Sequence, residues 1–116
     1  MNGNDIVIVS ATRTAIGKFG GQFATTSAIE LGTTVAKAAI QKANLSPEQI
    51  DTVIFGNVLQ AGLGQNPARQ VGLGAGLHHT SIAVTINEVC GSGLKAIISA
   101  AQAIRLGDAK IVLAGG

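Results

Sequence analysis

Cys90 is the only cysteine of the chain, and it lies in the segment NEVCGSGLKAI, between an apolar run and a helical pattern. A thiol reacts as its thiolate, and the unpaired amides and positive dipole end of a helix N-terminus stabilise that form. A cysteine between a strand and the next helix also lies at the edge of the sheet where open α/β proteins build their sites. The pattern favours a nucleophile at Cys90, with a small packing residue as the alternative.

A nucleophilic cysteine requires a proton acceptor, most often a histidine. The chain has two histidines, His78 and His79, and both precede the predicted strand that Cys90 follows. Six strand residues at about 3.3 Å each put these histidines roughly 20 Å from the sulfur. We therefore expect the base that activates Cys90 to lie outside these 116 residues.

Three other motifs use the same region. Gly91 to Ala96 (GSGLKA) matches a dinucleotide-binding fingerprint, but the next predicted strand ends in Gly115-Gly116 instead of the required acidic residue. Ser92 does not match the hydrolase motif G-x-S-x-G, because the two positions that require glycine are held by Cys90 and Leu94. His78, His79 and Glu88 lack metal-ligand spacing, so no metal site is expected. Nothing in the pattern identifies cofactor-binding residues.

The elements that must position Cys90 alternate along the chain. The order β-α-β-α-β-α-β predicts an α/β fold with a mostly parallel sheet and helices on both faces. Ser27 and Glu30 form a capping box at the start of the first helix, which should end near Asn44. The predicted strands are Ile6 to Ala11, Thr52 to Asn57, Ile82 to Asn87 and Lys110 to Ala114, and the predicted helices are Ala28 to Ala43, a short one opening at Asn66-Pro67, and Gly91 to Leu106.

The predicted helix from Gly91 to Leu106 carries one narrow polar stripe, formed by Ser92, Lys95, Ser99 and Gln102. A helix that is apolar on nearly all other sides is expected to be buried on most of them. Glycines in its first turn weaken a helix by about 1 kcal/mol each relative to alanine. Gly91 and Gly93 therefore suggest that a ligand or another chain approaches the backbone closely.

Composition points to a covered surface. Apolar residues make up 47% of the chain and charged residues 12%, about half the usual 25% or so for a globular protein. A partner subunit or further chain would explain this deficit, and the end at Gly116 within a strand suggests a fragment.

The net charge of +2 comes from scattered residues, which argues against nucleic-acid binding. Neither a membrane span nor a secretory signal is evident, so we expect a cytoplasmic protein.

Four segments resemble the thiolases, a family of acyl-CoA acyltransferases. They are VIVSATRTAIGKFGG, GNVLQAGLGQNPARQ, VCGSGLKA and IVLAGG, and in this order they span most of the chain. The resemblance implies a layered αβαβα fold with two similar halves. It also implies that residues 1–116 are a partial N-terminal thiolase domain of a longer enzyme, whose activating histidine and second cysteine lie in a later part.

By this resemblance, Cys90 would accept an acetyl group as a thioester, and its backbone N–H would contribute to an oxyanion hole. The enolate of a second acetyl-CoA would then attack, giving acetoacetyl-CoA and CoA, or thiolysis would run in reverse. Coenzyme A would be part of the substrate and no separate cofactor is expected. The partners implied are an acyl-CoA substrate and further copies of the chain, as a dimer or tetramer, with Leu59 to Gly76 near the dimer contact.

Two alternatives remain open. The chain could be a non-catalytic structural or interaction fragment that complements a second chain. It could also resemble the ketoacyl synthases, related condensing enzymes to which VCGSGLKA is less similar. Arg13 and Arg69 belong to no motif with assigned chemistry, and both are interpreted as structural.

Overall fold

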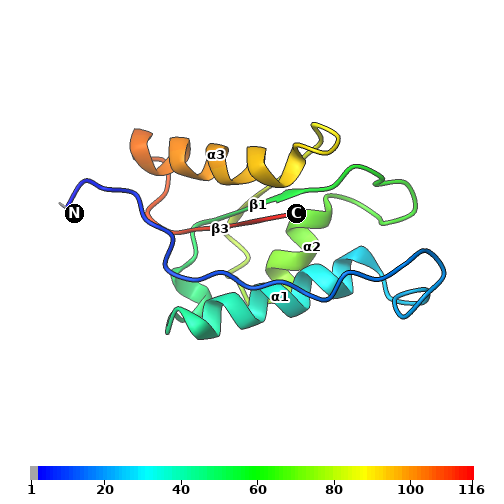
Figure 1. Ribbon diagram of the computed structural model, residues 1–116. Coiled ribbons are helices and arrows are strands. Elements are labelled where there is room, and N and C mark those ends of the chain that lie inside the picture. The colour runs from blue at the N-terminus through cyan, green and yellow to red at the C-terminus, as the bar shows by residue number, and fades with distance from the viewer. Residues whose placement is uncertain (1–2) are drawn as a thin grey trace.

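The computed structural model describes residues 3–116, which form a parallel sheet between helices (Figure 1). Within this range, no helix is long and apolar enough to cross a membrane. The elements in chain order are α1 (Ala28–Lys42), the 3-10 helix η1 (Pro47–Gln49), β1 (Thr52–Gly56), α2 (Pro67–Gly74), β2 (Ile82–Ile86), α3 (Ser92–Leu106) and β3 (Val112–Gly115).

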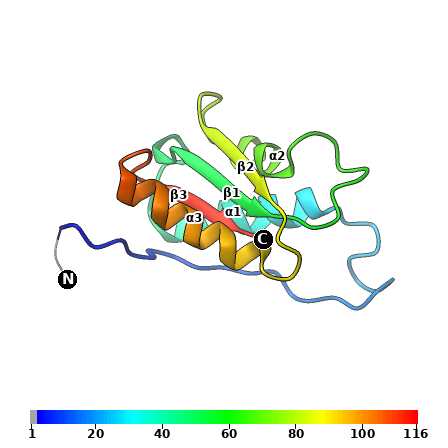
Figure 2. The same ribbon diagram turned by 90° about the horizontal axis from the view of Figure 1, so that it is seen from above.

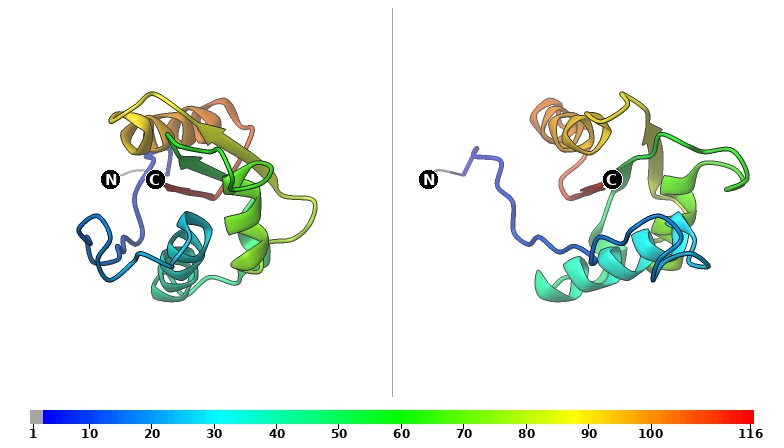
Figure 3. Two further views of the ribbon diagram at one scale, coloured as in Figure 1. Left: turned by 90° about the vertical axis from the view of Figure 1, so that its right-hand side faces the viewer. Right: turned by 45° about the vertical axis from the view of Figure 1, so that its right-hand side comes forward.

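The three strands of residues 3–116 are parallel and follow the order β2-β1-β3. Thr52 of β1 pairs with Ile82 on one side and with Val112 on the other. Seen from the end of the sheet, α3 covers one face while α1 and α2 cover the other (Figure 3). The predicted α/β class, with a parallel sheet and helices on both faces, is confirmed.

The alternation of side chains along β1 divides the core between the two faces. Val53 and Phe55 belong to the cluster formed with α1 and α2. Ile54 points to the opposite face, where it packs with Ala96 and Ala100 of α3. These two alanines are small, so α3 lies close to the sheet and its first turn is held against the end of β1.

The helix boundaries follow the capping signals. The Glu30 N–H donates to Ser27 Oγ at 3.1 Å and the Ser27 N–H donates to Glu30 Oε2 at 2.7 Å, which confirms the capping box of α1. After α1, Asn44 adopts a positive φ of 56° that ends the helix. At α2, the Asn66 side chain accepts the Arg69 N–H at 3.2 Å.

The predicted strand from Ile6 to Ala11 is wrong for the described structure. These residues form an extended segment that stays apart from the sheet and runs beside α1 (Figures 1 and 3). Ser10 Oγ donates to the Ala39 carbonyl at 2.7 Å and Thr12 Oγ1 to that of Val35 at 2.9 Å. A β-branched run is suited to a sheet, but this segment pairs with neither open edge of the sheet, and Ser10 bonds to α1 instead. Ile8 is accordingly 75% exposed.

The expectation that α3 is buried on most sides is also wrong within residues 3–116. One side of α3 is buried, through Ser92, Ala96 and Ala100. Leu94 is 66% exposed, and Ile97 and Ile98 are each 44% exposed. A single sheet contacts only one side of a helix, and no other element of residues 3–116 covers the outer side of α3 (Figure 2). The apolar side chains on that side are therefore exposed.

Candidate active site

Cys90 lies in the turn between β2 and α3, at the carboxyl end of the parallel strands. Its side chain is exposed. The thiol is therefore not a packing residue in the core of this chain, which was the alternative to a nucleophile. Position and exposure both agree with the predicted role of Cys90, which remains a prediction.

The turn before α3 is tight and has an uncommon backbone conformation. The Gly91 N–H donates to the Glu88 carbonyl at 3.1 Å, and the Ser92 N–H donates to the Val89 carbonyl at 3.2 Å. Val89 has a φ of 52°. For a β-branched residue this left-handed conformation is an outlier that the surroundings must stabilise. The Asn87 side chain assists by accepting the Val89 N–H at 3.0 Å.

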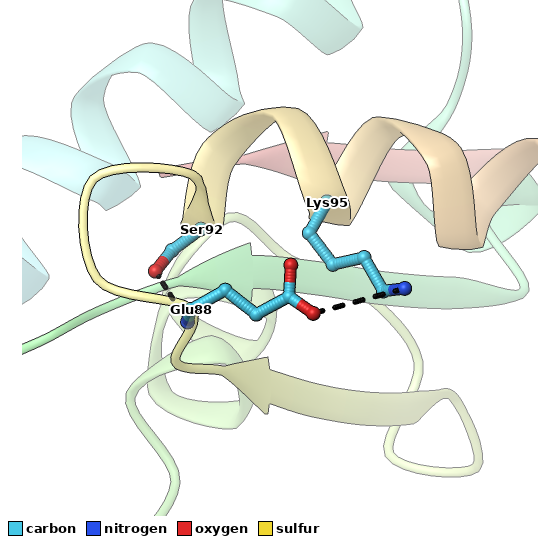
Figure 4. A network of polar contacts seen from close by, with 3 residues as sticks. All are labelled: Glu88, Ser92 and Lys95. Carbon is cyan, nitrogen blue, oxygen red and sulfur yellow. Dashed lines mark hydrogen bonds and ion pairs between the residues drawn. The ribbon is translucent and has the colours of Figure 1, made fainter.

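Ser92 bridges the two ends of this turn. Its side-chain oxygen accepts the Glu88 N–H at 2.8 Å (Figure 4). It also donates its own proton to the Val89 carbonyl at 2.6 Å. Ser92 is 4% exposed. The hydroxyl is therefore shielded from water and acts within the turn that carries Cys90.

One ion pair lies beside the turn. Glu88 Oε1 is 3.8 Å from Lys95 Nζ, and both side chains are substantially exposed (Figure 4). An exposed pair of this kind contributes at most about 1 kcal/mol to stability. Its effect at the site is local: Lys95 offsets the negative charge that Glu88 places two residues from the thiol.

Glycines bring the first turn of α3 onto the sheet. A Cβ on Gly56 would lie 2.6 Å from the Ser92 carbonyl carbon, and one on Gly116 would lie 2.9 Å from Gly93 Cα. By contrast, a Cβ on Gly91 would come no closer than 3.5 Å to Glu88, and one on Gly93 no closer than 3.8 Å to Gly116. Gly56 and Gly116 thus make a close approach to the backbone of Gly93 within residues 3–116, whereas the approach of a ligand or another chain to Gly91 and Gly93 stays a prediction.

The structure separates the histidines from Cys90. His78 and His79 precede β2 and Cys90 follows it, and the five residues of β2 span roughly 16 Å at about 3.3 Å each. His78 Nδ1 instead lies 2.7 Å from Thr80 Oγ1. Within residues 3–116, no group of three His, Cys, Asp or Glu side chains is placed to hold a metal ion.

Arg69 has the structural role that the sequence suggested. Its guanidinium donates to the carbonyls of His79 at 2.8 Å and Ser81 at 2.9 Å, and so holds the loop before β2 against α2. Arg13 donates to the carbonyl of the adjacent Thr14 at 3.0 Å.

The sequence reading missed the bridge made by Ser92 and the positive φ of Val89. The available signal was the N-cap of α3, because Gly91 has no side chain with which to cap the helix. A serine directly after such a glycine is placed to bond back into the preceding turn.

Comparisons with known proteins agree with this arrangement. The family model described as thiolase, N-terminal domain, matches residues 6–116. Acetyl-CoA acetyltransferase of Escherichia coli strain K12 is 61% identical over 110 residues, which are 95% of this chain and 28% of that protein. Acetyl-CoA acetyltransferase of Cupriavidus necator is also 61% identical, over 112 residues that cover 97% of this chain and 28% of that protein.

A solved structure shares the fold. The crystal structure of a thiolase from Ascaris suum in complex with coenzyme A has a TM-score of 0.85 and 48% identity, covering 86% of this chain and 26% of that one. The chain therefore spans a little over a quarter of the length of the relatives that it matches.

Proposed function

The chain belongs to the thiolase family, and we propose that it supplies the acyl-accepting cysteine of an acetyl-CoA acetyltransferase. The observation that carries this proposal is the exposed Cys90 in a stabilised turn at the start of α3. The relatives named acetyl-CoA acetyltransferase support the substrate class. The ketoacyl synthase alternative has no support from these matches.

In the first half-reaction, the Cys90 thiolate attacks the thioester carbonyl of acetyl-CoA. The carbonyl oxygen becomes an oxyanion, which the backbone N–H of Cys90 stabilises. The tetrahedral intermediate then collapses, the bond to the CoA sulfur breaks, and CoA leaves as a thiolate that takes up a proton. The acetyl group is now a thioester on Cys90.

In the second half-reaction, a base removes a proton from the methyl group of another acetyl-CoA. The resulting enolate attacks the acetyl carbonyl, forms a carbon–carbon bond and expels the Cys90 thiolate. The products are acetoacetyl-CoA and the free enzyme, and thiolysis runs the same steps in reverse. Coenzyme A enters as part of the substrate, so this scheme uses no separate cofactor.

The acid and base groups belong, in this proposal, to polypeptide beyond the 116 residues. The support is geometric, because His78 and His79 lie at the opposite end of β2 from Cys90. In addition, the surface of α3 that faces away from β1 is exposed and apolar. We therefore treat residues 1–116 as part of an N-terminal thiolase domain. A dimer or tetramer with a contact near Leu59 to Gly76, and a cytoplasmic location, remain predictions.

Acetylation of Cys90 tests the proposal. The complete acyltransferase is mixed with acetyl-CoA, quenched in acid and digested, and the peptide that contains Cys90 is analysed by mass spectrometry. We expect a mass increase of one acetyl group on that peptide in the wild type and none in Cys90→Ala. An unmodified wild-type peptide, or an adduct that persists in Cys90→Ala, contradicts the proposal.

A second candidate function is that of a non-catalytic fragment that complements another chain. The distance from the histidines to Cys90 favours it, since residues 3–116 place no histidine near the thiol. The two functions differ in one measurement. If the complete protein condenses acetyl-CoA and the Cys90→Ala variant is equally active, the non-catalytic role is the correct one.

A further inference from the structure

We propose that Ser92 is a positioning residue for Cys90, which fixes the direction of the Cys90 backbone N–H. The proposal rests on the function proposed for Cys90, in which that N–H stabilises the oxyanion. Ser92 itself touches neither the thiol nor the substrate in this scheme. It acts through the Val89 carbonyl, to which its hydroxyl donates at 2.6 Å.

The argument begins with the geometry of one peptide unit. The carbonyl of Val89 and the N–H of Cys90 belong to the same planar trans peptide, so they point in opposite directions. Ser92 holds this carbonyl twice, through its hydroxyl at 2.6 Å and through its own N–H at 3.2 Å. With the carbonyl directed into α3, the Cys90 N–H is directed away from the helix.

Val89 makes this restraint necessary. Its φ of 52° lies in the left-handed region, which a β-branched side chain disfavours. Without the hydroxyl, the turn can relax towards an ordinary negative φ, and the peptide plane between Val89 and Cys90 turns with it. The Ser92 hydroxyl opposes this relaxation at both ends, because it also accepts the Glu88 N–H at 2.8 Å.

Ser92 is itself firmly placed. It is 4% exposed, and its backbone rests on Gly56 of β1, where even a single added carbon would come within 2.6 Å. Through Ser92, the turn is therefore held in a fixed position relative to the sheet, and its anchor is not a mobile surface group (Figure 4). This combination of rigid support and strained neighbour distinguishes Ser92 from the other polar residues of α3.

The test compares Ser92→Ala with Ser99→Ala in the complete acyltransferase. Ser99 lies on the same helix, two turns further on, and the substitution removes the same atom. Three quantities are measured for each protein: the rate of Cys90 acetylation over a range of acetyl-CoA concentrations, the rate of Cys90 alkylation by iodoacetamide, and the thermal midpoint.

We expect Ser92→Ala to lower the maximal acetylation rate about 10- to 100-fold, because a misdirected donor fails to meet the oxyanion. The acetyl-CoA concentration for half-maximal rate should change less than about threefold, since binding is not the step affected. Alkylation should also change less than about threefold, because displacement of iodide forms no oxyanion. Ser99→Ala should leave both rates at the wild-type level.

Several outcomes overturn the proposal. Equal acetylation in the wild type and Ser92→Ala shows that the hydroxyl is not needed. An equal loss of acetylation and alkylation shows an effect on the sulfur instead of the N–H. If the wild type itself is not acetylated at Cys90, the proposed function fails first, and that result is distinct from the other two.

If Ser92→Ala does not fold, the same substitution is tested in the Val89→Gly variant. Glycine adopts a positive φ without strain, so Val89→Gly should tolerate loss of the hydroxyl. Glycine also adopts negative φ about as readily, so without the hydroxyl the peptide plane between residues 89 and 90 is again free to turn. Adding Ser92→Ala should therefore lower acetylation at least about tenfold relative to Val89→Gly alone. No difference between these two proteins overturns the proposal.

Discussion

The Cys90 side chain is proposed to react, and the side chains of neighbouring residues stabilise the backbone conformation of its turn. Asn87 and Ser92 both direct polar atoms to the main chain of the turn, and each bonds to Val89. The exposed ion pair of Glu88 and Lys95 adds little to stability by comparison. At this scale, the conformation of the site depends mainly on hydrogen bonds to the backbone of two consecutive residues, Glu88 and Val89.

Asp51 shows how a single carboxylate joins elements at the opposite end of the sheet. Its Oδ2 accepts the Lys110 N–H at 2.7 Å and the Ile111 N–H at 3.0 Å. The hydrogen bond from Ile111, followed by that from Lys110, lowers the pKa of Asp51 below its ordinary value. These bonds fasten the segment that leads into β3 beside the start of β1.

We expect Asp51→Asn to destabilise the fold at neutral pH by about 1 kcal/mol, since water screens this exposed group. The folded-state pKa is depressed, so the stabilisation is fully present above the unfolded pKa of about 3.9 and is lost as pH falls through the folded value. Urea unfolding of both proteins from pH 7 downwards measures the difference. A difference that stays constant below pH 4 or so would contradict this prediction.

At the scale of elements, the site depends on the contact between α3 and β1. Ala96 and Ala100 bury the middle of the helix against Ile54, and Gly56 admits its first turn. Small residues at a helix–sheet contact allow close approach, and a larger side chain has no space to occupy. The carboxyl end of β1 therefore determines how close to the sheet the turn that carries Cys90 lies.

Gly56→Ala should lower the free energy of unfolding by about 1–3 kcal/mol, because the new methyl group would overlap Ser92. Gly93→Ala is the matched control: its methyl group has room, and alanine favours a helix by about 1 kcal/mol over glycine. Urea unfolding at pH 7 compares the two variants with the wild type. Equal stability of all three proteins would show that Gly56 is not required for this contact.

At the scale of the whole molecule, an unusual amount of surface is exposed. The accessible area is 7489 Å², whereas a compact folded protein of this mass has about 5,800 Å². Exposed apolar side chains contribute on the extended N-terminal segment, on the outer side of α3 and along β2. A surface of this kind is typical of proteins that associate with another chain.

We expect the 116-residue chain by itself to associate at micromolar concentration, because burial of this apolar surface is favourable. Leu94→Glu on the exposed side of α3 should weaken the association, since a charge there resists burial. Gln102→Glu on the same helix adds the same charge at an exposed polar position and should have little effect. Sedimentation velocity over a concentration series measures both, and a monomer at every concentration would contradict the prediction.

The sequence by itself determined the α/β class, the order of elements from α1 to β3 and the place of Cys90 between β2 and α3. These features depend on local signals: the capping box at Ser27, the Asn66-Pro67 helix start and short apolar runs. Helix and strand boundaries agreed to within two residues, because such signals act over a few neighbouring positions.

Only the tertiary structure decided which surfaces find a neighbour. The β-branched segment from Ile6 to Ala11 lies beside α1 instead of forming the predicted strand, and α3 is covered on one side instead of on most sides. Likewise, the positive φ of Val89 and the bridge from Ser92 became evident only in the structure, where the first turn of α3 lies against Gly56. A residue pattern determines which side of a segment is apolar and so suited to burial. Burial itself requires a second surface, and that surface is supplied by residues far away in the sequence.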